Sequence, residues 1–186
     1  MRNRWLPYII VIGALFVIGA FAFMRQMSDD TPRPPFSQEE LAATIALAIS
    51  QSDADLFEAT LFDLDDLDDY VALASAKADS AELLRLRSFA VAQHADWPLY
   101  LEQMRAQFAQ VVADAHRADA RKLSVEGLTA NMRRLDPATG RVIFGNFDIF
   151  LSDGDTRYTL ETAMLRQTAD GWKLSGDALR LYKDAP

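Results

Sequence analysis

The pattern of hydrophobic and polar positions divides the chain into three parts. The first part holds an uncharged run, Trp5 to Met24, which is bracketed by Arg4 and Arg25. A helix of this length rises about 1.5 Å per residue and so spans roughly 30 Å, the thickness of a bilayer's hydrocarbon core. The run therefore predicts one transmembrane helix, with residues 1–25 as an anchor and the proline-containing residues 26–36 as a tether.

A cleavable signal peptide is the alternative for this run, because Ala20-Phe21-Ala22 has the small-x-small pattern of a cleavage site. The run is longer than the roughly 7–15 apolar residues of a cleavable segment, which favours retention. Arg2 and Arg4 balance Arg25 and Arg33 across the run, and the α-amino group then favours an inside N-terminus. We expect a single-pass protein of the cytoplasmic (inner) membrane, with its domain on the extracytoplasmic side.

Helical spacing of apolar residues characterises the second part, residues 37–118. Ser37 and Glu40 match a capping box that begins a helix, and Asp79 matches another with Glu82. Further starts fall at Ser52 or Asp53 and at Asp96. We expect the helix that begins after Asp79 to end near His94, before a separate long helix with Pro98 in its first turn.

The segment Asp63 to Asp69 holds five aspartates in seven residues and raises the question of a calcium site. An EF-hand loop needs a glycine at its sharp turn and a glutamate at position 12, and this segment has no such glycine. Leu64, Leu67 and Val71 follow helical spacing, so the aspartates are better explained as capping residues at a helix start. We expect no metal site here; the alternative is a weak surface cation site or a docking patch for a basic partner.

The third part, residues 119–183, has the period of two that is typical of strands. A one-residue slip at Gly127 predicts a β-bulge, and turns are expected at 136–140 and at Asp153-Gly154. One strand is expected over 141–152 and another over 172–182. The whole pattern predicts an α+β domain, 37–186, in which a helical half packs on a curved antiparallel four-stranded meander.

Pairing around an Asp153-Gly154 loop can be written residue by residue. Ile149 would face Tyr158, and Asp148 would face Thr159. The apolar residues would then share one face, while Asp148 and Glu161 would share the opposite, polar face. A three-residue loop at 169–171 would place Trp172 on the apolar face.

The composition of the chain excludes several classes of function. Of 19 basic residues, two (Arg2 and Arg4) precede the apolar run, which leaves 17 against 27 acidic residues, a balance of −10. Such a surface repels nucleic acid, so we expect no nucleic-acid partner. The chain has no cysteine, which excludes disulfides and thiolate metal sites. No phosphate-binding glycine loop, HExxH or G-x-S-x-G motif occurs, and we expect no cofactor.

The order of helices, long bulged strands and a closing Gly171-Trp172-Lys173-Leu174 strand resembles the NTF2-like (cystatin-like) superfamily of cone-shaped α+β domains. Similar domains serve as isomerases and dehydratases, as small-ligand binders, and as single-span scaffold subunits of secretion assemblies. The resemblance implies a fold and leaves the function open.

Candidate site residues are few. His94 is expected in a loop, and Asp148, Glu161 and Tyr158 on strands, where Tyr158 faces away from the two carboxylates. Because these groups do not converge on a pocket, we expect no enzyme activity. Phe144 and Phe150 would give the polar face an apolar area for a partner. We therefore expect an interaction module, subunit or assembly factor of a membrane or envelope complex. The alternative is a small-ligand binder, or an isomerase or hydrolase, with an acid/base pocket.

Overall fold

The computed structural model describes residues 37–184, which belong to one compact unit. The expected anchor (1–25) and tether (26–36) lie outside the described residues. Within residues 37–184, no helix combines the length and the apolar character needed to cross a membrane. The described chain is an α+β domain, with its helices in the N-terminal half and antiparallel strands after them.

In the first part of the domain, the helices begin at the capping residues that were expected from the sequence. The Ser37 hydroxyl accepts a hydrogen bond from the Glu40 backbone N–H, and the Glu40 carboxylate accepts one from the Ser37 N–H. Asp63 and Asp66 form the same reciprocal pair, which confirms that the aspartate cluster is a helix start. The helices are α2 (Gln38–Gln51), α3 (Ala54–Glu58), α4 (Leu64–Ser75) and α5 (Ser80–Arg117).

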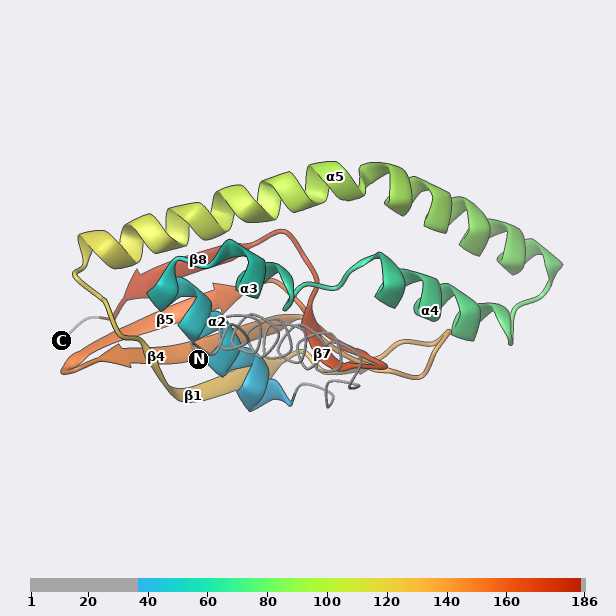
Figure 1. The fold of residues 1–186 in the computed structure, drawn as a ribbon. Coiled ribbons are helices and arrows are strands. Elements are labelled where there is room, and N and C mark those ends of the chain that lie inside the picture. Colours follow the sequence, from blue (N-terminus) through green and yellow to red (C-terminus); the bar gives the residue numbers. More distant parts are fainter. Residues whose placement is uncertain (1–36, 185–186) are drawn as a thin grey trace, which may run out of the picture. The chain divides into compact units, whose positions relative to one another are not determined.

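The expected break near His94 is wrong, because α5 is one helix of 38 residues that runs through Asp96 and Pro98. The helix bends near its middle, where Pro98 lies (Figure 1). Proline lacks the N–H that would bond to the carbonyl four residues earlier, which is a common cause of such a bend. Tertiary contacts hold both halves in place, since His94 bonds to Asp68 of α4 and Phe108 packs in the core.

The strands form two four-stranded antiparallel sheets instead of the single meander that was expected. One sheet has the order β1-β4-β5-β8 and the other has the order β2-β3-β6-β7. The strands are β1 (Ser124–Asn131), β2 (Arg134–Leu135), β3 (Val142–Phe144), β4 (Asn146–Asp153), β5 (Thr156–Thr162), β6 (Leu165–Thr168), β7 (Gly171–Leu174) and β8 (Leu179–Lys183). Both sheets keep the meander order, because each long strand of the meander contributes one piece to each sheet.

All four long strands are therefore interrupted between the two sheets, and we call this line of interruptions the crease. At Gly145, an added Cβ would lie 3.1 Å from the Cβ of Met132, so the crease brings two backbones close together. At Gly176 the backbone has a φ of +140°, a value that residues with a side chain rarely adopt. The expected continuous strands over 141–152 and 172–182 are accordingly wrong.

The register of the β4–β5 hairpin differs from the expected one by two residues. Asp153 pairs with Thr156, so the loop is Gly154-Asp155, and Ile149 pairs with Leu160. Since side chains alternate with a period of two, a shift by two keeps each residue on its expected face. Asp153 stays in the strand because its carboxylate accepts hydrogen bonds from the backbone N–H groups of Arg121 and Lys122.

Two further details of the strands were tested. The slip at Gly127 is confirmed as a bulge, since Val125 pairs with Leu151 and Gly127 with Phe150. The loop at 169–171 is shorter than expected, because Gly171 pairs with Thr168. Trp172 still packs against the core, on the same face of β7 as the buried Leu174.

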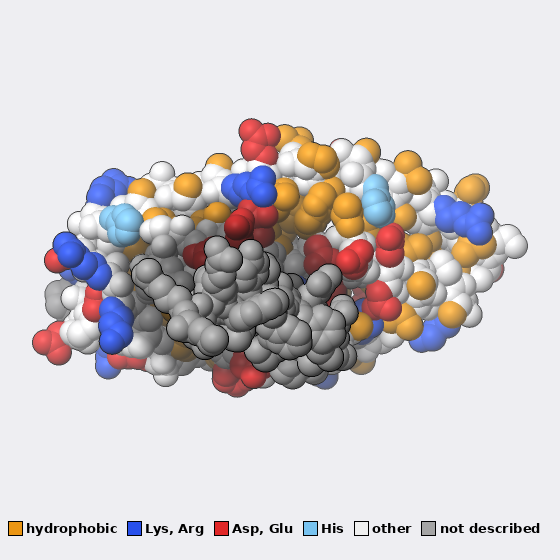
Figure 2. Space-filling model, in the orientation of Figure 1, with side chains coloured by type: hydrophobic (Ala, Val, Ile, Leu, Met, Phe, Trp, Pro, Cys, Tyr) orange, Lys and Arg blue, Asp and Glu red, His pale blue; other side chains and the backbone are white. Residues whose placement is uncertain are grey.

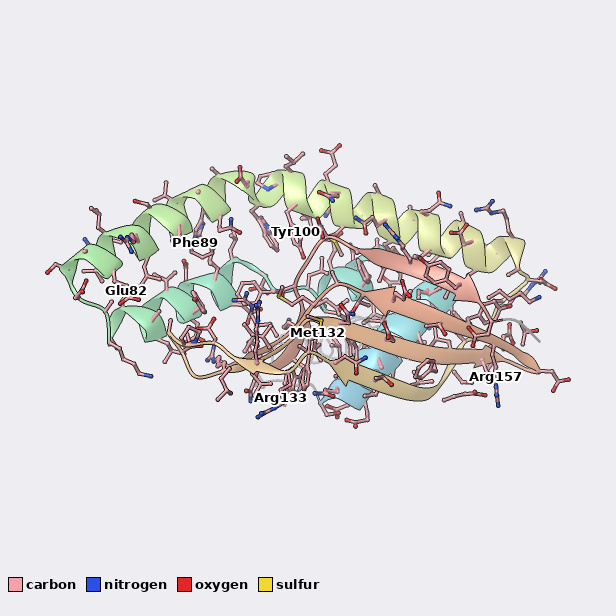
Figure 3. All side chains as sticks on the ribbon, turned by 180° about the vertical axis from the view of Figure 1, so that it is seen from behind. Glu82, Phe89, Tyr100, Met132, Arg133 and Arg157 are labelled. Atoms are coloured by element: carbon pink, nitrogen blue, oxygen red, sulfur yellow. The ribbon has the colours of Figure 1, made fainter. Side chains whose placement is uncertain are left out.

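The hydrophobic core lies between the helices and one face of the β1-β4-β5-β8 sheet. The buried strand residues of this core include Phe147, Ile149, Leu151 and Leu160, each 0% exposed. From the helices, Phe57 stacks on Phe108 with ring centroids 4.5 Å apart. Figure 3 shows the opposite, outer face of the strands, which the described helices leave uncovered.

Candidate functional site

The carboxylates that were expected on the outer face do lie there, side by side. Asp148 pairs with Glu161, and neighbouring strands add Thr129 and Arg180 to the same row. Partial burial, and then the charge of Glu161, raise the pKa of Asp148. The row is a cross-strand arrangement of polar groups on the outer face of the sheet.

Tyr158 and His94 do not lie on the outer face with that row. Tyr158 is buried in the core, 2% exposed, and its hydroxyl donates to the carbonyl oxygen of Ala118 at 3.4 Å. His94 lies on the surface of α5, where its Nε2 is 3.0 Å from Asp68. The expectation that Tyr158 faces away from Asp148 and Glu161 is confirmed.

The two phenylalanines do not share a surface as expected. Phe144 is half-buried against Trp172, with ring centroids 5.5 Å apart, and its strand partner Leu165 is fully buried. Phe150 is 38% exposed on the outer face. The crease at Gly145 separates the two residues and turns Phe144 toward the core, so the expected apolar sheet face is wrong.

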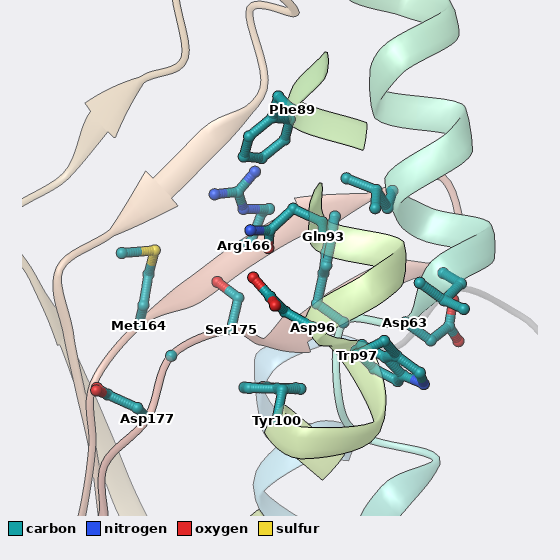
Figure 4. Close-up of a pocket in the computed structure, with 14 residues that line it drawn as sticks. Asp63, Phe89, Gln93, Asp96, Trp97, Tyr100, Met164, Arg166, Ser175 and Asp177 are labelled. Atoms are coloured by element: carbon teal, nitrogen blue, oxygen red, sulfur yellow. The ribbon is translucent and has the colours of Figure 1, made fainter. Parts of the chain in front are cut away.

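A cleft of about 320 Å³ lies at the crease, beneath the middle of α5 and beside the start of α4. Its lining is mainly apolar and aromatic, with Phe62, Phe89, Trp97 and Tyr100 around it (Figure 4). The crease supplies the floor through Met164, Arg166 and Ser175–Asp177. We call this the crease cleft.

Three buried polar atoms of cleft-lining residues have no hydrogen-bond partner among the described residues. They are the Tyr100 hydroxyl, the Nε of Arg166 and the Ser175 hydroxyl. The Tyr100 hydroxyl lies near the backbone of Gly176 but completes no hydrogen bond of normal geometry, and burial raises the pKa of Tyr100. Buried polar groups nearly always have a hydrogen-bond partner. Three unpaired polar atoms around one cleft therefore indicate that a bound molecule supplies their partners.

Arg166 is the only cation that lines the crease cleft among the described residues. Its guanidinium lies over the rings of Phe62 and Tyr70, 5.0 and 5.5 Å from their centroids. Within the described part of the chain, no carboxylate forms a salt bridge with it. Burial lowers the pKa of Arg166, but an arginine remains charged. The charge of Asp136 acts against this lowering of the pKa, but within the described residues no ion pair joins Asp136 to Arg166.

No protein family, curated protein or solved structure matches this chain.

A second feature is an exposed apolar line on the N-terminal half of α5. It consists of Leu84, Ser88, Val91, Ala95 and Leu99, all exposed and all uncharged, and we call it the α5 stripe. Leu84, Val91 and Leu99 are 67%, 71% and 68% exposed. Figure 2 shows hydrophobic side chains gathered along this half of α5 and beneath its middle. The helix residues half-buried toward α4 lie on the other side, so the stripe faces away from α4.

Sequence reasoning missed both features for different reasons. The three-four spacing of the α5 stripe is visible in the sequence, but Leu83, Leu86 and Ala90 give the same helix a second apolar side, and spacing alone does not tell which side stays exposed. Arg166 and Ser175 carry no local signal, since the crease alone brings them beneath Tyr100. Among the described residues, no group of three His, Asp or Glu side chains could hold a metal ion.

Proposed function

We propose that this chain is a single-pass membrane-anchored interaction module, a subunit or assembly factor that docks through the α5 stripe onto an apolar helix of another envelope protein. The observation that carries the proposal is the exposure of Leu84, Val91 and Leu99 on one side of α5. Large apolar side chains that follow one another at helical spacing on an open face are typical of a helix-docking surface.

The shape of the domain supports the same conclusion. α4 and the first half of α5 run antiparallel and extend beyond the end of β7, so the stripe is presented away from the sheets (Figure 1). Leu67 and Ala74 are buried between the two helices, and Tyr70 meets Phe89 edge-on at 6.5 Å, which stiffens this pair. A stiff, protruding helix loses little conformational freedom when it binds.

Charge defines the partner's chemistry. Arg85 and Arg87 lie on either side of the α5 stripe, whereas the whole chain carries a net charge of −8. A partner helix with an apolar face and acidic residues beside it would fit this local pattern. Anchoring by the Trp5–Met24 run would hold the domain within a short tether of the bilayer, on the extracytoplasmic side, close to the parts of membrane proteins that project from it.

The fold assignment to the NTF2-like superfamily is part of this proposal. Helices on one face of antiparallel strands in meander order support it. The segment after α3 also adds one parallel bridge, Leu61 to Leu174, at the edge of the second sheet. Some domains of this superfamily serve, without catalysis, as scaffold subunits with one membrane span.

The test is the mass of the full-length chain extracted from its native membranes in mild detergent. We expect a discrete complex larger than the monomer that is lost in the Val91→Glu variant, since an uncompensated charge in an apolar interface prevents docking. The matched control is Ala109→Glu, an exposed position on the same helix beyond the stripe, which should keep the complex. A monomeric wild type, or a complex that survives Val91→Glu, would refute docking through the stripe.

A further inference from the structure

We propose that the crease cleft binds a small zwitterionic molecule with one carboxylate, one amino group and an aromatic or other apolar body, the chemistry of a free apolar amino acid. The proposal is independent of docking by the α5 stripe, which lies on the opposite side of α5. It rests on the size of the cleft, on its lining and on its unpartnered polar atoms.

Size and lining define the body of the ligand. A cleft of about 320 Å³ holds on the order of ten water-sized groups, which is near the lower end for small-molecule sites. Four aromatic residues line it, together with Leu64, Leu67 and Met164. Flat aromatic side chains around a narrow space favour a flat apolar body over an extended polar one.

The three orphan atoms define the head group. The Nε–H of Arg166 can only donate, and the hydroxyls of Tyr100 and Ser175 can each donate as well. A carboxylate accepts several hydrogen bonds at once and would neutralise the guanidinium, which has no salt bridge of its own among the described residues. Figure 4 shows Arg166 and Ser175 on the same side of the cleft, across from α5.

The carboxylates at the margin of the cleft favour a ligand that also carries a positive charge. Three carboxylates line the cleft: Asp63 caps α4, whereas Asp96 and Asp177 are exposed at the margin. Within the described residues, none of the three takes part in a salt bridge. They would repel a phosphate or a dicarboxylate and attract an ammonium group. A ligand with its carboxylate on Arg166 and its amine toward the aspartates satisfies both ends of the site.

The binding test compares three probes that share a phenyl body, using the full chain in lipid nanodiscs with empty nanodiscs as the blank. The probes are phenylalanine, 3-phenylpropionate, which lacks the amine, and phenethylamine, which lacks the carboxylate. Titration calorimetry should show phenylalanine binding most tightly and phenethylamine most weakly. No binding of phenylalanine at millimolar concentration, or phenethylamine binding as tightly as phenylalanine, would overturn the proposal.

Variants locate the site. Tyr100→Phe and Ser175→Ala should each weaken phenylalanine binding about three- to tenfold, the range for one lost hydrogen bond. Their melting temperatures should not fall, because in the free protein neither hydroxyl has a partner among the described residues. The matched control is Tyr158→Phe, a buried tyrosine away from the cleft, which should leave binding unchanged. Unchanged affinity in both Tyr100→Phe and Ser175→Ala would refute this site.

Discussion

Gly176 lies at the crease between β7 and β8, and its replacement by alanine tests why the sheet is interrupted there. The backbone at this position has a φ of +140°, which an alanine adopts only at a cost of roughly 1–3 kcal/mol. The new Cβ would also lie 2.8 Å from the Cβ of Ala163. Neither atom can rotate away, so the overpacking adds roughly another 1–3 kcal/mol. We expect Gly176→Ala to lower the free energy of unfolding by roughly 2–6 kcal/mol.

Urea denaturation of the full-length chain in detergent, followed by circular dichroism, measures this loss. Gly154→Ala is the matched control, since its φ is +61° but an added Cβ meets nothing within 4 Å. That control should lose only the backbone part, about 1–2 kcal/mol. The double variant Gly176→Ala/Ala163→Gly removes the contact and should recover part of the loss. If Gly176→Ala costs no more than Gly154→Ala, close approach at the crease is refuted.

Four further substitutions test the outer face, a cap with its control, and the core. Burial and the charge of Glu161 raise the pKa of Asp148, so the ionised form of Asp148 opposes folding. Urea denaturation at pH 7 should therefore show that Asp148→Asn stabilises the protein by tenths of a kcal/mol. This gain should vanish below about pH 4, where the carboxyl group is protonated in the folded and the unfolded chain. Asp79→Ala removes a cap and should cost about 1 kcal/mol by thermal melting, whereas Asp96→Ala, inside the continuous helix, should cost under about 0.5. Phe57→Ala, at a fully buried position, should cost about 3–5 kcal/mol in urea.

Features encoded by neighbouring residues were predictable from the sequence. The capping pairs at Ser37 and Asp63 depend on side chains three residues from the backbone groups that they bond, so their spacing is enough to identify them. The sequence also predicted that Phe147 and Ile149 share the apolar face of the strand. This prediction held although the expected register was wrong by two residues, because side chains alternate between faces with a period of two.

Features set by distant contacts were not predictable in this way. Asp153 is held in β4 by the backbone of Arg121 and Lys122, more than 30 residues away, and this moves the hairpin loop by two residues. Helix α5 likewise makes distant contacts on both sides of Pro98, through His94 to Asp68 and through Phe108 to Phe57. The crease cleft is the extreme case, since its polar residues come from the start of α4, from α5, from β6 and from the β7–β8 connection.

The crease also has a consequence for how the meander assembles. Hydrogen-bonded pairing normally spreads outward from a turn, one residue pair after another, and here the regular ladders end at the crease in every strand. The tight turns at the two ends of the meander can therefore each start a ladder. The two ladders are joined by backbone hydrogen bonds across the crease, from Gly145 to Asn131 and from Ala163 to Ala178, and by α2, which contacts both β1 and β7.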